Sequence, residues 1–467
     1  MKLQFFGAAQ TVTGSKHIIT TDKGTKILLD CGLFQGIGTQ EMNQTFGFDP
    51  SEIDYMVLSH AHIDHTGLLP RLVAKGFKGP IFCTSATRDL AEILLGDSAK
   101  IQSNDLKRVN ERRIKRGENA LELLYGEDDV VQTLDQMRSM TYRDSFQVCE
   151  EVSCIFMDAG HILGSASVNL TIKENNGQTI RLTFTGDIGR PSDRILKSPE
   201  PFPQADYIIC ESTYGNRLHP AAENVKAELL ELVHNICVKN RGKILIPAFS
   251  VGRTQEIVYA LDQLEEEGLL PKIPIFVDSP LSVKATGVMR KHRECYNPQI
   301  MRYLHEGDGD AFGFDHLTYI SEKADSIALN DSKGPAVIIS ASGMAEAGRI
   351  KHHIANNISD PNCAILFVGY CSPEGLGGRL KAGEKQVRIF GNDYQVNCQI
   401  HIMDSFSAHG DYSELIQFLD CQNKAEVKKI FLVHGELETQ IAFKKRLQDI
   451  GWGEILIPKM FDQFELS

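Results

Sequence analysis

The sequence predicts an α/β protein in which one domain interrupts another. Both ends of the chain are rich in short strands separated by glycines, whereas residues 212–390 alternate between strand-like and helical segments. Such alternation is typical of a parallel sheet with helices on its faces. The strand-rich pattern returns near residue 388, which indicates that the first domain resumes there. At 467 residues the chain is long enough for two or more domains of ordinary size.

The first domain is expected to begin with three short strands, each apolar or β-branched and separated from the next by a glycine-containing turn. Helical periodicity follows at 68–75. A long charged segment, 87–124, is also periodic and is expected to form a helix that serves as a lid. The strands predicted for this part are 2–6, 17–21, 26–29, 80–83, 152–157, 168–172 and 181–185.

The interrupting segment alternates regularly. Strands are expected at 243–247, 273–277, 336–339 and 364–368, and helices at 225–238, 254–267, 281–292 and 349–357. We place the interrupted domain at 1–208 and 391–467 and the inserted domain at 209–390.

The composition excludes several classes of protein. With 42% hydrophobic and 24% charged residues the chain resembles a globular protein, and no apolar run approaches the roughly 20 residues of a membrane span. The N-terminus has the character of a first strand rather than of a signal peptide. Eleven cysteines occur singly, without a C-x-x-C pair, as expected for reduced thiols in the cytoplasm. A membrane partner is not expected.

Oligomeric state stays open at this stage. Apolar residues of the C-terminal segment fit either the core or the interface of a homodimer. They are Trp452, Ile455, Leu456 and Ile457.

The net charge of −12 argues against a large basic surface for nucleic acid. Positive charge would have to be local. One candidate lies in the long charged segment, where the alternative is an ordinary solvated helix face. Its residues are Lys100, Lys107, Arg108, Arg112, Arg113, Lys115 and Arg116.

A histidine-rich segment after a short apolar run is the most informative feature of the chain. The sequence H-A-H-I-D-H at 60–65 places three histidines and an aspartate within six residues. On extended backbone, alternate side chains share a side, so His60 and His62 can contact the same ion. Asp64 and His65 lie just beyond and can turn toward a second one. Such ligands suit zinc and similar divalent metals. The alternative is a polar helix N-terminus with surface histidines.

Further ligands are expected where strands end, because open α/β sheets bind at the carboxyl ends of their strands. His161, Asp187 and His434 each follow a predicted strand. The predicted ligands are His60, His62 and His161 for a first metal, Asp64, His65 and His434 for a second, and Asp187 as the bridge. Two metals about 3.5–4 Å apart would share a water or hydroxide and lower its pKa. Asp30 also ends a strand and is expected to accept a hydrogen bond from a ligand imidazole.

This order of residues resembles the metallo-β-lactamase superfamily. Asp30 matches its first aspartate, the segment 60–65 its H-x-H-x-D-H motif, and His161, Asp187 and His434 follow in order. The resemblance implies an αββα sandwich of two mixed sheets with a dinuclear site at one edge. These motifs alone do not choose between lactamases, glyoxalase II-like thioesterases and nucleases.

The insertion between Asp187 and His409 makes that choice. E-S-T-Y-G at 211–215 resembles motif A of the β-CASP nucleases, S-A-H at 407–409 motif B and V-H-G-E at 433–436 motif C. Other stretches similar to that family are 247–256, 278–281, 340–344 and 348–353. The expected fold is therefore a metallo-β-lactamase sandwich with an inserted α/β β-CASP domain.

Motif C indicates the branch of the family. The branch related to the endonuclease subunit of the mRNA 3′-end cleavage factor carries a histidine there, as this chain does at His434, whereas the DNA-repair branch has an apolar residue. The KH modules of some archaeal relatives and the C-terminal domain of ribonuclease J-type enzymes are not expected, because the chain begins at the first strand and ends soon after motif C.

The resemblance implies a ribonuclease that hydrolyses phosphodiester bonds of single-stranded RNA through a hydroxide bound by two zinc ions, leaving a 5′-phosphate and a 3′-hydroxyl. Manganese or iron are alternatives to zinc, and cleavage inside the chain or from the 5′ end fits equally. The expected catalytic residues are Asp64, Glu211 and His409. His409, oriented by Glu211, would protonate the leaving ribose oxygen or bind the scissile phosphate. The alternative is a hydrogen-bonded core pair.

Phosphate contacts are expected from the inserted domain. Small residues after strands let backbone N–H groups approach phosphates, and arginines bind them in a bidentate manner. A cleft between the domains would admit a single strand but not a duplex. The candidates, each equally consistent with an ordinary turn, cap or surface role, are Arg253, Ser340, Ser342, Gly343, Arg349, His352, His353 and Arg379.

Two competing functions stay open. A hydrolase of small esters or thioesters would use the same metal core, but it leaves the insertion, Glu211 and His409 without a role. A non-catalytic RNA-binding scaffold is the other, and it predicts decay of the metal ligands, which the sequence does not show.

Overall fold

The computed structural model describes residues 1–36, 38–219, 225–403 and 408–467. The chain divides into two compact units. The sandwich unit comprises Met1–Leu218 and His409–Ser467, and the inserted unit comprises His219–Ala408. These limits place residues 209–218 with the sandwich and residues 391–408 with the insertion, whereas the sequence analysis set the breaks after 208 and 390.

The first sheet of the sandwich unit combines antiparallel strands from the N-terminus with parallel strands that lead to the histidine-rich segment. Its order is β22-β1-β2-β3-β4-β5-β6. The strands are β1 (Lys2–Gly7), β2 (Lys16–Thr20), β3 (Lys26–Leu29), β4 (Tyr55–Val57), β5 (Ile81–Thr84), β6 (Met137–Met140) and β22 (Gln463–Glu465).

The second sheet has the order β21-β20-β11-β10-β9-β8-β7. An antiparallel meander, β7 to β10, is extended by parallel strands on the far side of β10. The strands are β7 (Ser145–Cys149), β8 (Val152–Asp158), β9 (Ala166–Lys173), β10 (Thr179–Phe184), β11 (Tyr207–Glu211), β20 (Lys429–Val433) and β21 (Glu454–Leu456).

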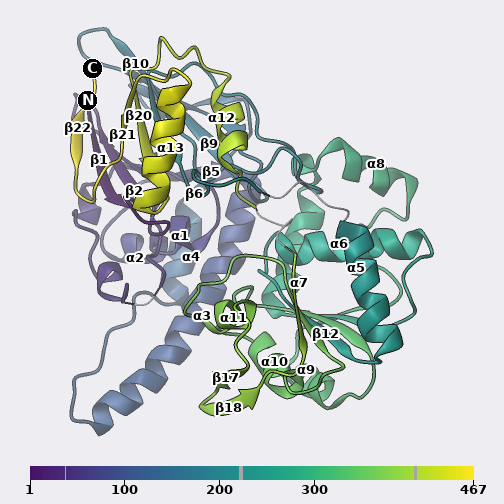
Figure 1. The fold of residues 1–467 in the computed structure, drawn as a ribbon. Coiled ribbons are helices and arrows are strands. Elements are labelled where there is room, and N and C mark those ends of the chain that lie inside the picture. Colours follow the sequence, from purple (N-terminus) through teal and green to yellow (C-terminus); the bar gives the residue numbers. More distant parts are fainter. Residues whose placement is uncertain (37, 220–224, 404–407) are drawn as a thin grey trace. The chain divides into compact units, whose positions relative to one another are not determined.

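The core of the sandwich unit lies between these sheets. Phe5 and Leu29 of the first sheet belong to one buried cluster with Phe156, Phe184 and Phe431 of the second. The outer face of the second sheet is covered by α12 (Tyr412–Leu419) and α13 (Leu437–Asp449), whose apolar side chains pack onto β11 and β20. Figure 1 shows α13 lying along β20. The expected layered α/β fold is confirmed.

Helices α1 (Ile63–Thr66), α2 (Leu69–Ala74), α3 (Ser85–Lys115) and α4 (Glu127–Gln136) belong to the other side of the unit. The N-terminal part of α3 is buried, and its C-terminal part is solvent-exposed and extends away from the sheets (Figure 1). The predicted helix end at 124 is wrong. Gly117 adopts φ +75°, the left-handed conformation that ends helices, and α4, which the sequence analysis missed, follows.

The inserted unit is built on a parallel sheet, as predicted. Its order is β14-β13-β15-β12-β16-β19, and every neighbouring pair is parallel. The strands are β12 (Lys243–Pro247), β13 (Ile275–Asp278), β14 (Leu317–Ile320), β15 (Ala336–Ser340), β16 (Ala364–Phe367) and β19 (Gln399–Ile402). The four predicted strands of this unit lie within two residues of those observed.

Helices accompany these strands along the chain. They are α5 (Val225–Val233), α6 (Arg253–Glu266), α7 (Pro280–Lys291), α8 (Pro298–Glu306), α9 (Lys323–Asp331), α10 (Ile350–Asn357) and α11 (Leu376–Lys381). Ile350 and Ile354 of α10 and Leu376 and Leu380 of α11 share a buried cluster with Ile365 of β16. No helix among the described residues of the chain is both long and apolar enough to cross a lipid bilayer.

Candidate metal centre

The histidine-rich segment joins the end of β4 to the start of α1. His60 is fully buried, and His62 occupies the N-cap of α1 with extended backbone, φ −56° and ψ 148°. The backbone becomes helical after His62, so Asp64 and His65 lie in the first turn of α1. The Thr66 hydroxyl donates to the His62 carbonyl at 2.9 Å and fixes this turn.

The remaining predicted ligands stand at the ends of strands of the second sheet. His161 follows β8, Asp187 follows β10 and His434 follows β20. All three turns are sharp: Gly160 has φ +62°, Gly186 has φ +57°, and His434 itself has φ +51°. A non-glycine residue in this region is uncommon and often marks a functional position. Residues from both sheets therefore meet at one edge of the sandwich.

The first group contains His60, His62, His161 and Asp187, whose ligand atoms all lie within 4.8 Å of one another. His62 Nδ1 lies 3.2 Å from His60 Nε2 and 3.1 Å from His161 Nε2. Asp187 Oδ2 lies 3.5 Å from His60 Nε2 and 3.6 Å from His161 Nε2.

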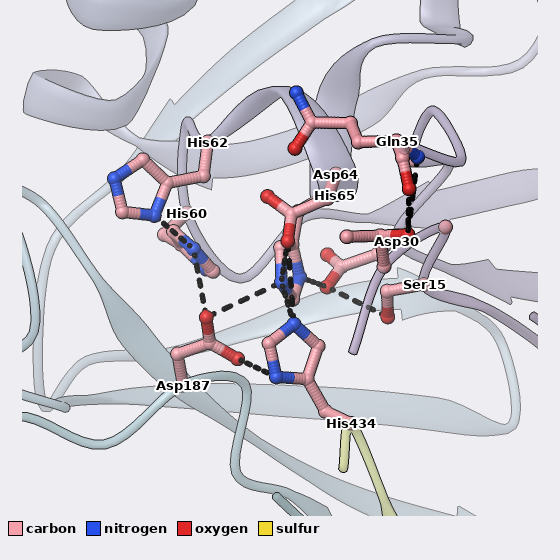
Figure 2. A network of polar contacts seen from close by, with 12 residues as sticks. Ser15, Asp30, Gln35, His60, His62, Asp64, His65, Asp187 and His434 are labelled. Carbon is pink, nitrogen blue, oxygen red and sulfur yellow. Dashed lines mark hydrogen bonds and ion pairs between the residues drawn. The ribbon is translucent and has the colours of Figure 1, made fainter. Parts of the chain in front are cut away.

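The second group contains Asp64, His65 and His434. His434 Nε2 lies 3.2 Å from His65 Nε2 and 3.3 Å from Asp64 Oδ2. Asp187 also contacts this group, with Oδ2 at 3.4 Å from His65 Nε2 and Oδ1 at 3.5 Å from His434 Nδ1. Figure 2 shows the labelled histidines and Asp187 pointing toward one another. Asp187 is thus the residue that lies between the two groups.

These residues fit bound divalent metal ions. The ring nitrogens lie about 3 Å apart and so can direct lone pairs at common points. Asp187 Oδ1 is buried, and none of the described residues donates a hydrogen bond to it, which is costly for a carboxylate unless a cation compensates. Imidazole nitrogens with carboxylate oxygens are the donor set that zinc prefers.

Burial sets the charge states of the first group. It lowers the pKa of His60 well below its ordinary value and the pKa of His62 to about 4. Both imidazoles are therefore neutral and offer a lone pair near neutral pH. Burial alone would raise the pKa of Asp187, but the charges of His434 and His65 hold it well below its ordinary value. Asp187 is therefore a carboxylate.

A second layer of polar residues orients the histidines. Asp30, fully buried at φ +56°, lies with Oδ2 2.6 Å from His65 Nδ1. The backbone N–H and hydroxyl of Ser59 both donate to Asp30 at 2.8 Å. The Thr213 hydroxyl lies 2.9 Å from His434 Nδ1. With their Nδ1 atoms held in this way, His65 and His434 direct Nε2 toward the second group.

Glu211 and His409 lie beside the first group. Glu211 Oε1 is 3.2 Å from His409 Nδ1 and accepts from the backbone N–H of Ile188 at 2.6 Å, while Oε2 accepts from Thr213 N–H at 3.2 Å. His409 Nδ1 is 4.0 Å from Asp187 Oδ2. Burial alone would lower the pKa of His409, but the charge of Glu211 and its hydrogen bond raise it to about 10. Ser407 of the same motif lies outside the described residues.

Two glycines are required by the close approach of backbone segments at the site. A Cβ on Gly32 would lie 1.5 Å from the carbonyl oxygen of Asp64, and one on Gly189 would lie 2.6 Å from the backbone nitrogen of His161. Any larger residue at position 32 would displace Asp64, and any larger residue at position 189 would displace His161.

The residues expected to contact phosphate all belong to the inserted unit, and several are engaged there by Asp278. Arg349 Nη1 donates to Asp278 Oδ1 at 2.7 Å, and His353 Nε2 lies 2.6 Å from Oδ2. The Ser340 hydroxyl donates to the Asp278 carbonyl at 2.7 Å. These three therefore anchor the loop between β15 and α10 and the start of that helix.

The other candidates differ in their surroundings. Arg253 is 7% exposed and bonds Glu256 at 2.9 Å, and Arg379 pairs with Glu384 at 2.7 Å on the surface. Ser342 is partly exposed and His352 is exposed. A Cβ on Gly343 would lie 2.7 Å from the ring of Phe249.

Sequence reasoning missed Ser59, Thr213 and Lys16. Ser59 directly precedes the histidine-rich segment and Thr213 lies within motif A, so one stood next to a known motif and the other inside one. Lys16 is fully buried, and its ammonium donates to the carbonyls of Gly14 and Gly32 at 2.8 and 2.9 Å. A single lysine at the start of a strand gives no such signal.

The sequence matches three known families in chain order. Residues 17–212 match the metallo-beta-lactamase superfamily and residues 254–380 the Beta-Casp domain. Residues 393–458 match the Zn-dependent metallo-hydrolase RNA specificity domain.

Curated relatives match along nearly the whole chain. A protein of Thermus thermophilus named as a ribonuclease is 34% identical over 447 residues, 96% of either chain. An RNase J-like protein of Methanocaldococcus jannaschii is 30% identical over 459 residues, which cover 98% of this chain and 96% of the relative. Cleavage and polyadenylation specificity factor 73 of Drosophila melanogaster is 30% identical over 453 residues, 96% of this chain and 62% of that protein.

Proposed function

This chain belongs to the β-CASP ribonuclease family of the metallo-β-lactamase superfamily, and on that premise we propose that it hydrolyses phosphodiester bonds of single-stranded RNA with two bound zinc ions. The observation that carries the proposal is the meeting of two groups of ligand side chains around Asp187, with Glu211 and His409 beside them. The match to an RNA specificity domain supports RNA as the substrate.

The proposed ligands follow the observed groups: His60, His62 and His161 for one ion, Asp64, His65 and His434 for the other, and Asp187 between them. When bound, such a pair supplies an activated water for in-line attack and neutralises negative charge on the phosphoryl oxygens. Manganese or iron would satisfy the same donors.

His409 is the proposed general acid or phosphate ligand. Glu211 accepts from Nδ1, so Nε2 is the nitrogen that would donate to the leaving ribose oxygen or to a phosphoryl oxygen. Two backbone N–H groups hold the Glu211 carboxylate, which prevents it from turning away. Orientation by a fixed carboxylate is the arrangement that acid–base histidines require.

The test is a gel assay with one 5′-labelled single-stranded RNA and the metal-loaded protein, run beside the same RNA as a duplex and an identical DNA. Internal RNA fragments would identify an endonuclease, and release of labelled mononucleotide alone a 5′-exonuclease. If no nucleic acid is cut while metal analysis gives a full site, the proposal fails.

A His409→Ala variant tests the role of that residue. We expect RNA cleavage to fall by about 10²–10⁴-fold, the usual contribution of a general acid, while metal content and thermal unfolding stay unchanged. His305→Ala, which removes an exposed histidine of α8, is the matched control and should cleave normally. Normal turnover by His409→Ala would contradict the assigned role.

Small substrates distinguish the proposed ribonuclease from the remaining alternative, a hydrolase of small esters or thioesters. We expect the protein to hydrolyse bis(p-nitrophenyl) phosphate in preference to an S-acyl glutathione. Preference for the thioester would favour a small-ester hydrolase, in which Glu211 and His409 have no assigned task.

A further inference from the structure

A hairpin of the inserted unit has an unexpected residue at its tip. Strands β17 (Gln386–Ile389) and β18 (Asn392–Gln395) pair in antiparallel register up to Ile389 and Asn392, so only Phe390 and Gly391 form the loop (Figure 1). Their φ angles are +53° and +87°. Two-residue loops with positive φ at both positions favour asparagine, aspartate or glycine, and a bulky residue in the left-handed region is an outlier. Turn chemistry therefore does not explain a phenylalanine here.

Burial does not explain it either. Val387 and Ile389 of the same hairpin are 1% and 0% exposed and belong to the core of the inserted unit, whereas Phe390 is 52% exposed. An aromatic ring held in a strained conformation and left in solvent is a candidate for a function outside the fold, and its neighbours distinguish it from Phe461, which is also exposed at positive φ.

The neighbours of Phe390 suggest what that function is. The ring of His352 stacks on it, with centroids 4.5 Å apart and planes 28° apart, and the Lys351 ammonium lies 5.2 Å from its centroid. Arg388 is exposed, and its Nε donates to the Gly391 carbonyl at 3.0 Å. We call Lys351, His352, Arg388 and Phe390 the Phe390 platform. Asp393, opposite Arg388 in the hairpin, is the acidic residue in register with it.

We propose that the Phe390 platform binds single-stranded RNA, with a base stacking onto the Phe390–His352 pair and the adjoining phosphate contacting Lys351 or Arg388. Stacking on an aromatic ring and charge contact at its edge together fit a nucleotide, because a base has a flat face and a phosphate is anionic. In a chain of net charge −12, paired cations beside an exposed ring favour RNA over an apolar peptide. The proposal extends the proposed function by naming a substrate-binding site whose residues are not ligands of the metal centre.

The test measures RNA affinity in the full-length, metal-loaded protein carrying His409→Ala, so that cleavage is suppressed. Anisotropy of a fluorescent single-stranded RNA is recorded for this parent and for three further variants. Phe390→Asn removes the ring and inserts a residue that the turn favours, so the fold is kept or stabilised. Phe390→Tyr keeps a ring. Phe461→Ala is the matched control, because Phe461 is also exposed at positive φ.

We expect Phe390→Asn to raise Kd roughly 5- to 100-fold, the range that one stacked base contributes, and Phe390→Tyr and Phe461→Ala to bind within about twofold of the parent. Lys351→Gln should reduce the slope of log Kd against log salt by about one phosphate contact. Parental affinity in Phe390→Asn, equal losses in Phe390→Asn and Phe390→Tyr, or no RNA binding by the parent would each overturn the inference.

Failure of this inference is distinguishable from failure of the proposed function. The same RNA is offered to the protein with His409 intact. If the protein with His409 intact cleaves the RNA and Phe390→Asn binds it with unchanged affinity, the inference about the platform is wrong and the ribonuclease function stands. If RNA binding depends on Phe390 but the protein with His409 intact does not cleave the RNA, the proposed ribonuclease function is wrong and the platform stands.

Discussion

Asp30 illustrates how a single residue can set the geometry of ligands without being one. Its carboxylate receives two bonds from Ser59 and lies against Nδ1 of His65. An acceptor at Nδ1 keeps a proton on that nitrogen, so Nε2 is the atom whose lone pair a bound metal ion would take. The ring nitrogen that a proposed ligand offers is therefore decided by a residue outside its own helix, because Asp30 directly follows β3 whereas His65 lies in α1.

Replacing Asp30 by asparagine should weaken metal binding. The amide can present a donor to His65 Nδ1, which would favour the wrong tautomer, so we expect zinc affinity to fall about 10–100-fold. Competition with a chromophoric chelator measures this directly. Asp393→Asn, on an exposed hairpin, is the control. Unchanged affinity in Asp30→Asn would mean that Asp30 does not orient His65.

Gly32 allows a second residue-scale prediction. Because a Cβ there would lie 1.5 Å from the Asp64 carbonyl oxygen, Gly32→Ala should displace the start of α1, lower the metal content and lower the unfolding temperature. Gly96→Ala is the control, since nothing lies within 4 Å of its Cβ inside α3. That variant should gain stability, by up to about 1 kcal/mol. Equal metal content in the two variants would contradict the prediction.

At this scale the sequence predicted which histidine and aspartate side chains meet better than it predicted how backbone segments pack. His161, Asp187 and His434 were found because each follows a strand, and the structure brings them together with the histidine-rich segment. The buried Lys16 and the close contact of Gly32 depend on which backbone segments pack together. A single sequence does not carry that information.

At the scale of elements, Asp278 gives two of the residues expected to contact phosphate a structural partner. The β13 end carries a buried carboxylate that engages Arg349 and His353. An arginine and a histidine near a glycine-rich loop are typical of an anion-binding site. Here Arg349 and His353 join α10 to the end of β13. Asp278 can be identified as their partner only once the pairing of β13 with β15 in the parallel sheet is known.

Strand and helix positions were predictable wherever apolar periodicity was strong, as in β12 and α6. The exception is β19, near the C-terminal end of the inserted unit. It pairs with β16 and so extends the sheet of that unit. Its sequence, Q-I-H-I, is typical of a strand but does not say which sheet it joins. Pairing partners are set by tertiary packing and not by local pattern.

The contact between α6 and α8 should make stability depend on pH. The Tyr303 hydroxyl donates to Asp262 Oδ2 at 2.9 Å, and burial raises the pKa of Asp262 from 3.8 to about 7. A carboxyl group with a raised pKa loses stabilisation as pH rises, in this case from about 4 through about 7. Asp262→Asn cannot ionise and should escape that loss.

We therefore expect Asp262→Asn to raise the unfolding temperature of the inserted unit more at about pH 8 than at about pH 5. Calorimetry of the wild type and the variant at both values tests this, with Asp393→Asn as the control. An equal shift at both values would show that Asp262 titrates normally.

At the scale of the whole molecule, the two units should respond differently to metal removal. All the residues of the two ligand groups belong to the sandwich unit, and an ion that binds only the folded state stabilises that state. After chelation we expect faster amide exchange at 60–65 and 186–189 and unchanged exchange in β12 and β15. Uniform change across both units, or none, would contradict a metal centre confined to the sandwich unit.

The separation of Asp64 from His434, 370 residues along the chain, has a consequence during synthesis. A growing polypeptide carries the histidine-rich segment early, but in our assignment the second ligand group lacks a donor until residue 434 has left the ribosome. If the proposed function holds, a growing chain would therefore not cleave the message from which it is being translated.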